Sequence, residues 1–318
     1  MPLKIVSART YLLRVPVPAL RVDAQSVLDA WDVLAVEMVT DAGLIGCGYQ
    51  CGFGPAMAAL KHFVEGAILP DLIGSDARRH RQWWQDLYLL RHHTGLNGPA
   101  IQGLSVPSSP PGIYWPRRPM RSLWSLLGGE QGRRVPCYDT NCGWLGYTLE
   151  ELLDNVSRSI DQGFRGVKVK IGVDFEEDLR RLSAVRARLG DDSSLPMPTI
   201  AGICRRPCGG HHRWSSSTSP GWRSLCIPST FAATPSWLQR SRPRCCTVKK
   251  LYEPLMIRDM LEADTLGLVQ PSDMKLGGIS RWMDVTEIAR IAHRRVVPSD
   301  TPGANTAIKP EFIAQYAI

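Results

Sequence analysis

The sequence predicts an α/β fold, because segments with strand patterns alternate with segments with helix patterns. Near the N-terminus, two apolar strand patterns flank the turn Asp41-Ala42-Gly43. In the middle of the chain, an amphipathic helix pattern begins at Thr148 and ends at Gln162-Gly163-Phe164. The strand pattern Val167 to Ile171 follows directly. With 318 residues, the chain is long enough for a small domain and a larger α/β core.

The first part of the chain, up to about residue 125, has the pattern of an α+β domain. We expect strands from Lys4 to Arg14, from Val33 to Thr40 and from Leu44 to Tyr49. Helices should follow from Pro55 onward. This order of strands and then helices is typical of a small α+β domain.

Lys168 and Lys170 are the most informative residues of the chain. Side chains two residues apart on a strand point to the same face, so the two ammonium groups should lie together. The opposite face is apolar and consists of Val167, Val169 and Ile171. Mutual repulsion lowers the pKa of both lysines and favours an anion between them, such as a substrate carboxylate. Spacing alone also fits an edge strand with a solvated face.

Several segments carry a resemblance to one family, and their order along the chain makes it specific. They are Thr40 to Gly48, with the pattern T-D-x-G-L-x-G-x-G, Leu69 to Asp76 followed by Trp83-Trp84, Leu123 to Gly129, Val135 to Tyr138, Gly163 to Gly172 with its K-x-K pair, and Val269 to Ile279. Together they resemble the mandelate racemase/muconate lactonizing enzyme family of the enolase superfamily. The resemblance covers about two thirds of the chain.

For the fold, the resemblance implies an N-terminal α+β capping domain, residues 1–125, and an incomplete (β/α)₇β TIM-like barrel, residues 126–318. The barrel is expected to be incomplete because the 40 residues after Gly278 leave room for about one helix and one strand. The segments Val15 to Pro18 and Gly52 to Gly54 resemble the two specificity loops of the family. Ordinary turn chemistry is the alternative for both segments.

For the chemistry, the resemblance implies Mg²⁺-dependent abstraction of the proton α to a carboxylate, as in an acid-sugar dehydratase or racemase. Lys170 would be the base, while Lys168 would lower its pKa and contact the carboxylate. The segment that begins at Gln270-Pro271 resembles the sixth strand of the mandelate racemase subgroup. The implied partner is a small carboxylate or acid-sugar substrate, and the resemblance also allows a homo-oligomer.

The chain departs from the family at its sixth strand. Ser272 stands where the family has Asp or Lys. Asp273 is the next residue, and on a strand its side chain would face the opposite way. Asp273 is therefore a candidate for a displaced acid of the catalytic dyad. We expect Lys275 to have a structural role. We expect His293, in the helical run Val285 to Arg294, to lie at the surface.

Two blocks, 104–122 and 197–247, contain no Asp or Glu, and 197–247 shows no helix or strand period. Neither block has the pattern of a segment selected to fold. Codons that could encode residues 197–249 can also be read in a shifted frame. In that frame they permit three runs of amino acids, D-A-N, then E-E-P-L, then G-E. These letters are not residues of this chain. The resemblance places magnesium-binding carboxylates there, on the third, fourth and fifth barrel strands. We infer descent from such an enzyme through frame errors, so 197–247 should be poorly ordered, and we expect no metal-ligand triad and no magnesium binding. A non-catalytic product of a frame-damaged gene is therefore an alternative.

Composition narrows the classes of partner. The formal charge of +8 and the isoelectric point near 9.1 would suggest a polyanion. However, ten arginines lie in the two acid-free blocks, and without them the charge would be −2. We therefore expect no nucleic-acid partner, although a basic binding protein is a third alternative.

The cysteines and the hydropathy pattern favour the cytoplasm. The nine cysteines are odd in number and show no spacing pattern, and the chain has no signal peptide and no span of about 20 apolar residues. We therefore expect no membrane association. A zinc site could be imagined from six residues whose spacing fits no ordinary closed site, namely Cys204, Cys208, His211, His212, Cys245 and Cys246.

Overall fold

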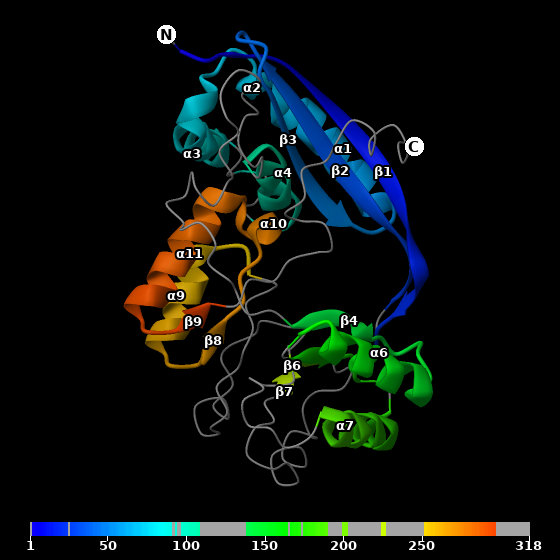
Figure 1. Ribbon diagram of the computed structural model, residues 1–318. Helices are drawn as coiled ribbons and strands as arrows, with labels where there is room; N and C mark the ends of the chain where they lie inside the picture. The colour runs from blue at the N-terminus through cyan, green and yellow to red at the C-terminus, as the bar shows by residue number, and fades with distance from the viewer. Residues whose placement is uncertain are drawn as a thin grey trace. The chain divides into compact units, whose positions relative to one another are not determined.

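The computed structural model describes residues 2–24, 26–90, 93, 97–108, 138–164, 166–172, 174–189, 199–202, 224–226 and 251–296 (Figure 1). The chain divides into two compact units. Unit 1 comprises Met1–Pro16, Ala30–Gly132 and Cys246–Ile318, and unit 2 comprises Val17–Asp29 and Arg133–Cys245.

The N-terminal sheet has the strand order β1-β2-β3 and is drawn in blue in Figure 1. Its strands are β1 (Ile5–Val22), β2 (Val27–Thr40) and β3 (Ile45–Gly52), and β2 pairs antiparallel with β3. At the predicted turn, Gly43 has a φ of +73° and its N–H donates to the Thr40 carbonyl at 2.9 Å. The two strands expected on either side of this turn are thus confirmed, and they pair antiparallel.

The first two strands are longer than expected, and the interpretation of Val15 to Pro18 as a loop is wrong. This segment lies inside β1. Proline lacks a backbone donor, but β1 is an edge strand of the described sheet, where a missing donor interrupts no ladder on the open side. The second segment interpreted as a loop, Gly52 to Gly54, connects β3 to α1, as expected. Gly52 ends β3, and Gly54, with φ +61°, is the N-cap of α1. The role of this segment in specificity stays a prediction.

The helices of unit 1 come from both ends of the chain. They are α1 (Pro55–Ala67), α2 (Leu69–Leu72), the 3₁₀ helix η1 (Ala77–Arg79), α3 (His80–Leu90), α4 (Pro99–Ser108), α9 (Pro254–Glu262), α10 (Asp273–Leu276) and α11 (Ile279–Ile291). The short strands β8 (Leu268–Val269) and β9 (Arg295–Val296) pair in parallel. The helix expected from Val285 to Arg294 therefore begins earlier and ends earlier.

The first residues of the block 104–122 are folded. Leu104 to Ser108 form the last turns of α4, and Leu104 and Val106 belong to the core together with Leu34, Val64 and Ile101. The view that the whole block is unsuited to folding is therefore wrong for these five residues, because their apolar side chains continue the buried face of the helix. Residues 109–122 lie outside the described part of the chain.

Buried polar contacts join the C-terminal elements of unit 1 to its N-terminal elements. Gln50 Nε2 donates to the Met274 carbonyl at 2.6 Å and to Ser105 Oγ at 3.1 Å. Trp84 Nε1 donates to the Gly277 carbonyl at 2.6 Å, and the Arg281 guanidinium lies 4.9 Å from the Trp84 ring centroid. Since buried polar groups left unpaired are costly, these bonds fix α10 against β3, α3 and α4.

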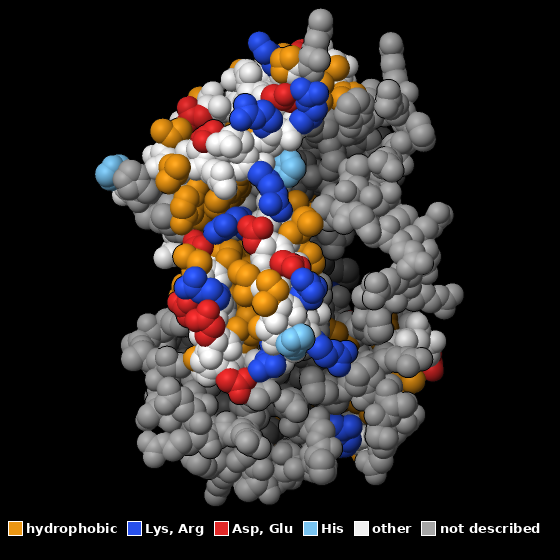
Figure 2. Space-filling view, turned by 90° about the vertical axis from the view of Figure 1, so that its left-hand side faces the viewer, with side chains coloured by type: hydrophobic (Ala, Val, Ile, Leu, Met, Phe, Trp, Pro, Cys, Tyr) orange, Lys and Arg blue, Asp and Glu red, His pale blue; other side chains and the backbone are white. Residues whose placement is uncertain are grey.

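Charges of both signs alternate on the face that carries α3, α9 and α11. Figure 2 shows blue and red side chains interspersed with orange ones along this face. The pairs include Arg290 with Glu287 at 2.6 Å and Arg281 with Glu253 at 2.8 Å. The described residues of this face therefore form no continuous basic stripe of the kind that binds a polyanion.

Unit 2 contains a parallel sheet with the strand order β4-β5-β6-β7. Its strands are β4 (Asp139–Gly143), β5 (Val167–Val169), β6 (Thr199–Gly202) and β7 (Ser224–Cys226), all paired in parallel, and its helices are α6 (Leu149–Asp161) and α7 (Phe175–Leu189). Thr148 and Glu151 form a capping box at the start of α6, and Gly163 follows its end at φ +86°. The predicted helix–glycine–strand unit is confirmed.

The parallel neighbour of β5 is β4, which begins directly after the segment Val135 to Tyr138; Val135 itself lies outside the described residues. The expectation that 197–247 has little regular structure is wrong at 199–202 and 224–226, which form β6 and β7. A parallel ladder uses backbone groups that every non-proline residue carries, so short strands form there without a periodic side-chain pattern. The other residues of the block lie outside the described part.

Among the described residues, strands form separate sheets of three, four and two strands. Closure into a barrel is therefore not resolved. None of the helices in the described part of the chain is long and apolar enough to cross a membrane.

Replacing Gly277 by alanine should lower the free energy of unfolding by at least ~1 kcal/mol. The backbone there has φ +86°, and a Cβ would lie 2.9 Å from the Trp84 ring. The matched control is Gly66→Ala in α1, where a Cβ would meet no atom within 4 Å and helix propensity should raise stability by roughly 0.5–1 kcal/mol. Urea unfolding measures both changes. Equal effects of the two substitutions would contradict the role given to the Gly277–Trp84 contact.

Candidate functional site

The candidate site lies at the carboxyl end of β5, where the chain leaves the sheet. Lys168 is central in the strand and only 8% exposed, and Lys170 follows the last strand residue and is half-buried. The Lys170 N–H donates to the Gly143 carbonyl at 2.7 Å. A Cβ at Gly143 would lie 2.5 Å from the Lys168 carbonyl oxygen, so only glycine permits this approach of β4 and β5. The structure thus brings the two predicted lysines together.

An aromatic ring packs on the ammonium group of Lys170. Lys170 Nζ lies 4.6 Å from the ring centroid of Trp144, which is 6% exposed and follows β4 directly. Cations attract the negative face of an indole ring, most strongly where water is excluded. Trp144 therefore fixes where the Lys170 ammonium group lies.

The pKa of Lys170 is lowered to about 8, mainly by burial and also by the charge of Lys168, against an opposing effect of Asp23. The sequence argument gave repulsion between the lysines as the cause, but burial has the larger effect. A lysine with this pKa is partly neutral near pH 8, so it can accept a proton there.

Two buried side chains of α7 hold the loops around the lysines. Arg181 donates to the Tyr147 carbonyl at 2.7 Å and to the Trp144 carbonyl at 3.0 Å. Asp178 accepts from the Gly172 N–H at 2.7 Å, and burial raises the pKa of Asp178 to about 6. One helix thus fixes the segments that follow both β4 and β5, which is the end of a parallel sheet where ligands bind.

A third cation reaches the same ring from the tip of the β1–β2 hairpin. The Arg21 guanidinium lies 5.4 Å from the Trp144 ring centroid. Leu145 N donates to the Val22 carbonyl at 2.9 Å, so the hairpin tip is bonded to the loop after β4. The sequence analysis missed both Arg21 and Trp144. They are more than a hundred residues apart, and only the position of a tryptophan directly after a strand could have drawn attention to one of them.

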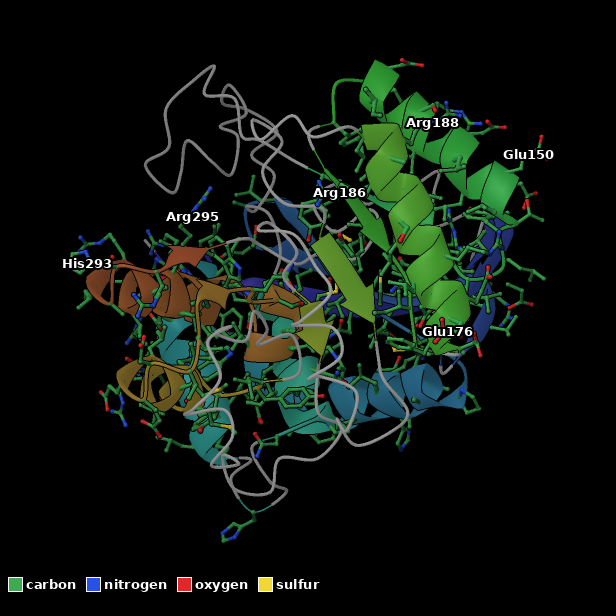
Figure 3. The ribbon with its side chains drawn as sticks, turned by 90° about the horizontal axis from the view of Figure 1, so that it is seen from below. Glu150, Glu176, Arg186, Arg188, His293 and Arg295 are labelled. Carbon is green, nitrogen blue, oxygen red and sulfur yellow. The ribbon has the colours of Figure 1, made fainter. Side chains whose placement is uncertain are left out.

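The residues predicted from the sixth strand lie in unit 1. Asp273 is the first residue of α10, so its placement on a strand is wrong, because the strand β8 ends at Val269. Lys275 Nζ lies 5.9 Å from the Tyr252 ring, in line with a structural role. His293 follows α11 with φ +52° and is exposed, as expected (Figure 3).

The described residues include no group of three His, Cys, Asp or Glu side chains that could hold a metal ion. Of the two strands next to β5, β4 carries one acidic residue, Asp139, at its start, and β6 reads Thr-Ile-Ala-Gly; β7, which pairs with β6, reads Ser-Leu-Cys. The six Cys and His residues weighed for zinc lie outside the described part.

Comparison with curated proteins finds acid-sugar enzymes. The chain is 30% identical over 293 residues to an arabinonate dehydratase of Saccharolobus solfataricus, covering 87% of this chain and 74% of the relative. It is 26% identical over 294 residues to a 3,6-anhydro-alpha-L-galactonate cycloisomerase of Streptomyces coelicolor, covering 90% and 79%. No family model matches the chain.

Comparison with solved structures finds the same fold. L-talarate/galactarate dehydratase from Salmonella typhimurium, liganded with Mg and L-lyxarohydroxamate, superposes with a TM-score of 0.70 at 19% identity, covering 94% of this chain and 78% of that one. A mandelate racemase/muconate lactonizing enzyme-like protein from Rubrobacter xylanophilus superposes with a TM-score of 0.75 at 19% identity, covering 95% and 83%. The chain therefore belongs to the mandelate racemase/muconate lactonizing enzyme family of the enolase superfamily.

Proposed function

We propose that this chain binds the carboxylate of a small acid sugar at Lys168 and Lys170 and that the proton-abstraction chemistry of its relatives is impaired. The observation that carries the proposal is the burial of two lysines, two residues apart, at the carboxyl end of β5. Two ammonium groups this close repel each other, and a bound carboxylate turns that repulsion into attraction. The relatives, an arabinonate dehydratase and a 3,6-anhydro-alpha-L-galactonate cycloisomerase, support an acid sugar as the ligand.

The magnesium ion of the related structures does not fit the residues described in this chain. Magnesium prefers carboxylate and water oxygens, and the sequences of β6 and β7, Thr-Ile-Ala-Gly and Ser-Leu-Cys, contain no carboxylate. We therefore assign no step to a metal. Asp273, the candidate displaced acid, is the first residue of a short helix in unit 1.

In this proposal Lys170 exchanges a proton with a bound substrate, and Lys168 binds its carboxylate. A proton α to a carboxylate is only weakly acidic, so a lysine needs strong stabilisation of the enediolate to remove it. A metal ion supplies several kcal/mol of such stabilisation. Because each ~1.36 kcal/mol is a factor of ten in rate, its loss alone reduces turnover by orders of magnitude.

A second candidate is the Mg²⁺-dependent dehydratase or racemase that a corrected reading frame would encode. The observation in its favour is the order of the sheet, in which β6 pairs with β5 and β7 pairs with β6. If β4 and β5 are the first two strands of a barrel, β6 and β7 stand where the third and fourth strands would be. The shifted-frame letters D-A-N and E-E-P-L fall beside these two strands. In this proposal residues 1–125 are the capping domain and residues 126–318 the partial barrel, with β4 to β7 as its first four strands. The non-catalytic product of a frame-damaged gene and the basic binding protein are the remaining alternatives.

Binding of arabinonate should weaken as the pH rises from 7 to 9. Lys170 has a lowered pKa of about 8, so it is mostly protonated at pH 7 and mostly neutral at pH 9, when its attraction for a carboxylate is lost. NMR titration of ¹³C-methylated lysines, with Lys170→Met to assign the signal, measures this pKa. Lys168→Met should raise the pKa of Lys170, because it removes the neighbouring like charge. An unchanged pKa in that variant would contradict the coupling.

Magnesium should leave the melting temperature of this chain almost unchanged, because stabilisation requires binding to the folded form. Differential scanning fluorimetry with millimolar MgCl₂ measures the shift. A clear shift that disappears in Asp273→Ala would instead reveal a substitute site.

The chain should exchange no α-proton of arabinonate in D₂O above a no-protein control, as measured by ¹H NMR. A variant with the shifted-frame letters restored should bind magnesium and exchange the proton, and Lys170→Ala in that variant should abolish exchange while magnesium binding persists. Exchange by the unrepaired chain would refute its impairment. Exchange unaffected by Lys170→Ala would refute the role given to Lys170. Sequencing the gene through the codons for 104–122 and 197–250 decides whether the frame errors are genuine.

A further inference from the structure

Lys170 carries an amine that is partly neutral and partly shielded from water. Its side chain is half-buried, and its pKa is lowered to about 8, so a substantial fraction is uncharged near that pH. A neutral amine has an available electron pair, and lysines that are desolvated or that lie next to another cation act as nucleophiles toward carbonyl groups. Proton abstraction is therefore only one of the reactions open to this residue.

Lys168 provides an anchor for a ligand next to this amine. The two lysines lie two residues apart, and Lys168 acts on the Lys170 amine through its charge and through a hydrogen bond between the side chains. A carboxylate held by Lys168 therefore brings the carbon bonded to it within reach of the Lys170 nitrogen. In a 2-oxo acid that carbon belongs to a ketone, which is the electrophile that an amine attacks.

Trp144 suits the product of such an attack. Its ring centroid lies 4.6 Å from Lys170 Nζ, and the residue is 6% exposed. An iminium ion keeps a positive charge on that nitrogen, so the ring attracts the adduct as it attracts the ammonium group. The indole N–H is also buried and has no hydrogen-bond partner within the described part of the chain. An oxygen atom of the ligand would satisfy this donor.

We propose that Lys170 forms a reversible imine with 2-oxo acids whose carboxylate lies at Lys168. The inference rests on the carboxylate-binding role given to Lys168 in the proposed function, and it adds a covalent activity that needs no metal ion. The ligand class follows from the geometry, because the anion and the electrophilic carbon must be directly bonded to reach two adjacent lysines.

The reaction balances without an oxidant or a reductant. The neutral Lys170 nitrogen attacks the ketone carbon, a C–N bond forms, and the electron pair of the carbonyl π bond moves to the oxygen. A proton passes from the nitrogen to that oxygen, which gives a carbinolamine. The hydroxyl group then takes up a proton from solvent and leaves as water, while the nitrogen electron pair completes the C=N bond. In sum, an amine, a ketone and a proton give an iminium ion and water.

Unselective reaction of lysines with a carbonyl compound is the competing explanation for any adduct. The chain has eight lysines, of which Lys4 is exposed and belongs to unit 1. Unselective reaction labels exposed lysines and does not depend on a carboxylate next to the ketone. The proposed site favours Lys170 and requires that carboxylate.

Reductive trapping separates the two explanations. The full-length chain is incubated at pH 8 with EDTA, sodium cyanoborohydride and either pyruvate or acetone, in which a methyl group replaces the carboxylate. The hydride reduces an iminium ion to a stable secondary amine, and peptide mass spectrometry gives the ratio of label at Lys170 to label at Lys4. This ratio cancels the intrinsic reactivity of the two ketones. The variants are Lys170→Met, Lys168→Met and the matched control Lys61→Met, a half-buried lysine of unit 1.

We expect the Lys170-to-Lys4 ratio to be at least about tenfold higher with pyruvate than with acetone, because a charge-assisted pair with the carboxylate is worth that much. Lys168→Met should remove this difference, and Lys61→Met should preserve it. Lys170→Met should leave only the label at the other lysines. Equal ratios for the two ketones in the unaltered chain, or label at Lys4 that matches label at Lys170 with pyruvate, would overturn the inference.

Arabinonate, which has no ketone, distinguishes failure of this inference from failure of the proposed function. An excess of arabinonate should protect Lys170 from labelling by pyruvate, because both ligands place a carboxylate at Lys168. Selective labelling that arabinonate does not reduce would overturn the proposed function and support imine formation. Absence of selective labelling, in a chain whose Lys170 NMR signal still shifts with arabinonate, would overturn imine formation while the proposed function stands.

Discussion

The burial of Lys170 beside Lys168 is the constraint on which the site in unit 2 depends. Removing an ammonium group from water is costly, and a second cation two residues away adds to that cost. The surroundings compensate in two ways, through the face of Trp144 and through loops that cannot relax away. Arg181 and Asp178 hold those loops from α7, through the carbonyls of Trp144 and Tyr147 and the N–H of Gly172. The backbone on either side of the two lysines is therefore fixed by one helix.

How much of this could be predicted from the sequence depends on the range of the interaction involved. The capping box at Thr148, the stop at Gly163 and the strand with its lysine pair were predictable, because each is set by residues within a few positions. The contacts of Trp144 with Arg21 and Lys170 were not, since they join segments that only the folded chain brings together. Asp273 was assigned to a strand because the segment Val269 to Ile279 resembles the sixth strand of the family, whereas the structure starts a helix there.

The two short strands in the acid-free block 197–247 show that strand pairing and catalytic chemistry depend on different parts of a residue, the backbone and the side chain. Parallel strands pair through backbone groups, so segments without a periodic side-chain pattern can still extend the sheet beyond β5, as β6 and then β7 do. Catalytic chemistry, in contrast, depends on the identity of particular side chains. The order of the strands in a sheet therefore carries no information about which side chains are available for catalysis.

The prolines of β1 have a consequence for association between chains. This 18-residue strand lies at the edge of the described N-terminal sheet, and an edge strand exposes backbone groups that could pair with a strand of another molecule. Pro16 and Pro18 remove two donors from the middle of that row. The residues that made this segment resemble a loop thus make β1 a poor template for edge-to-edge aggregation.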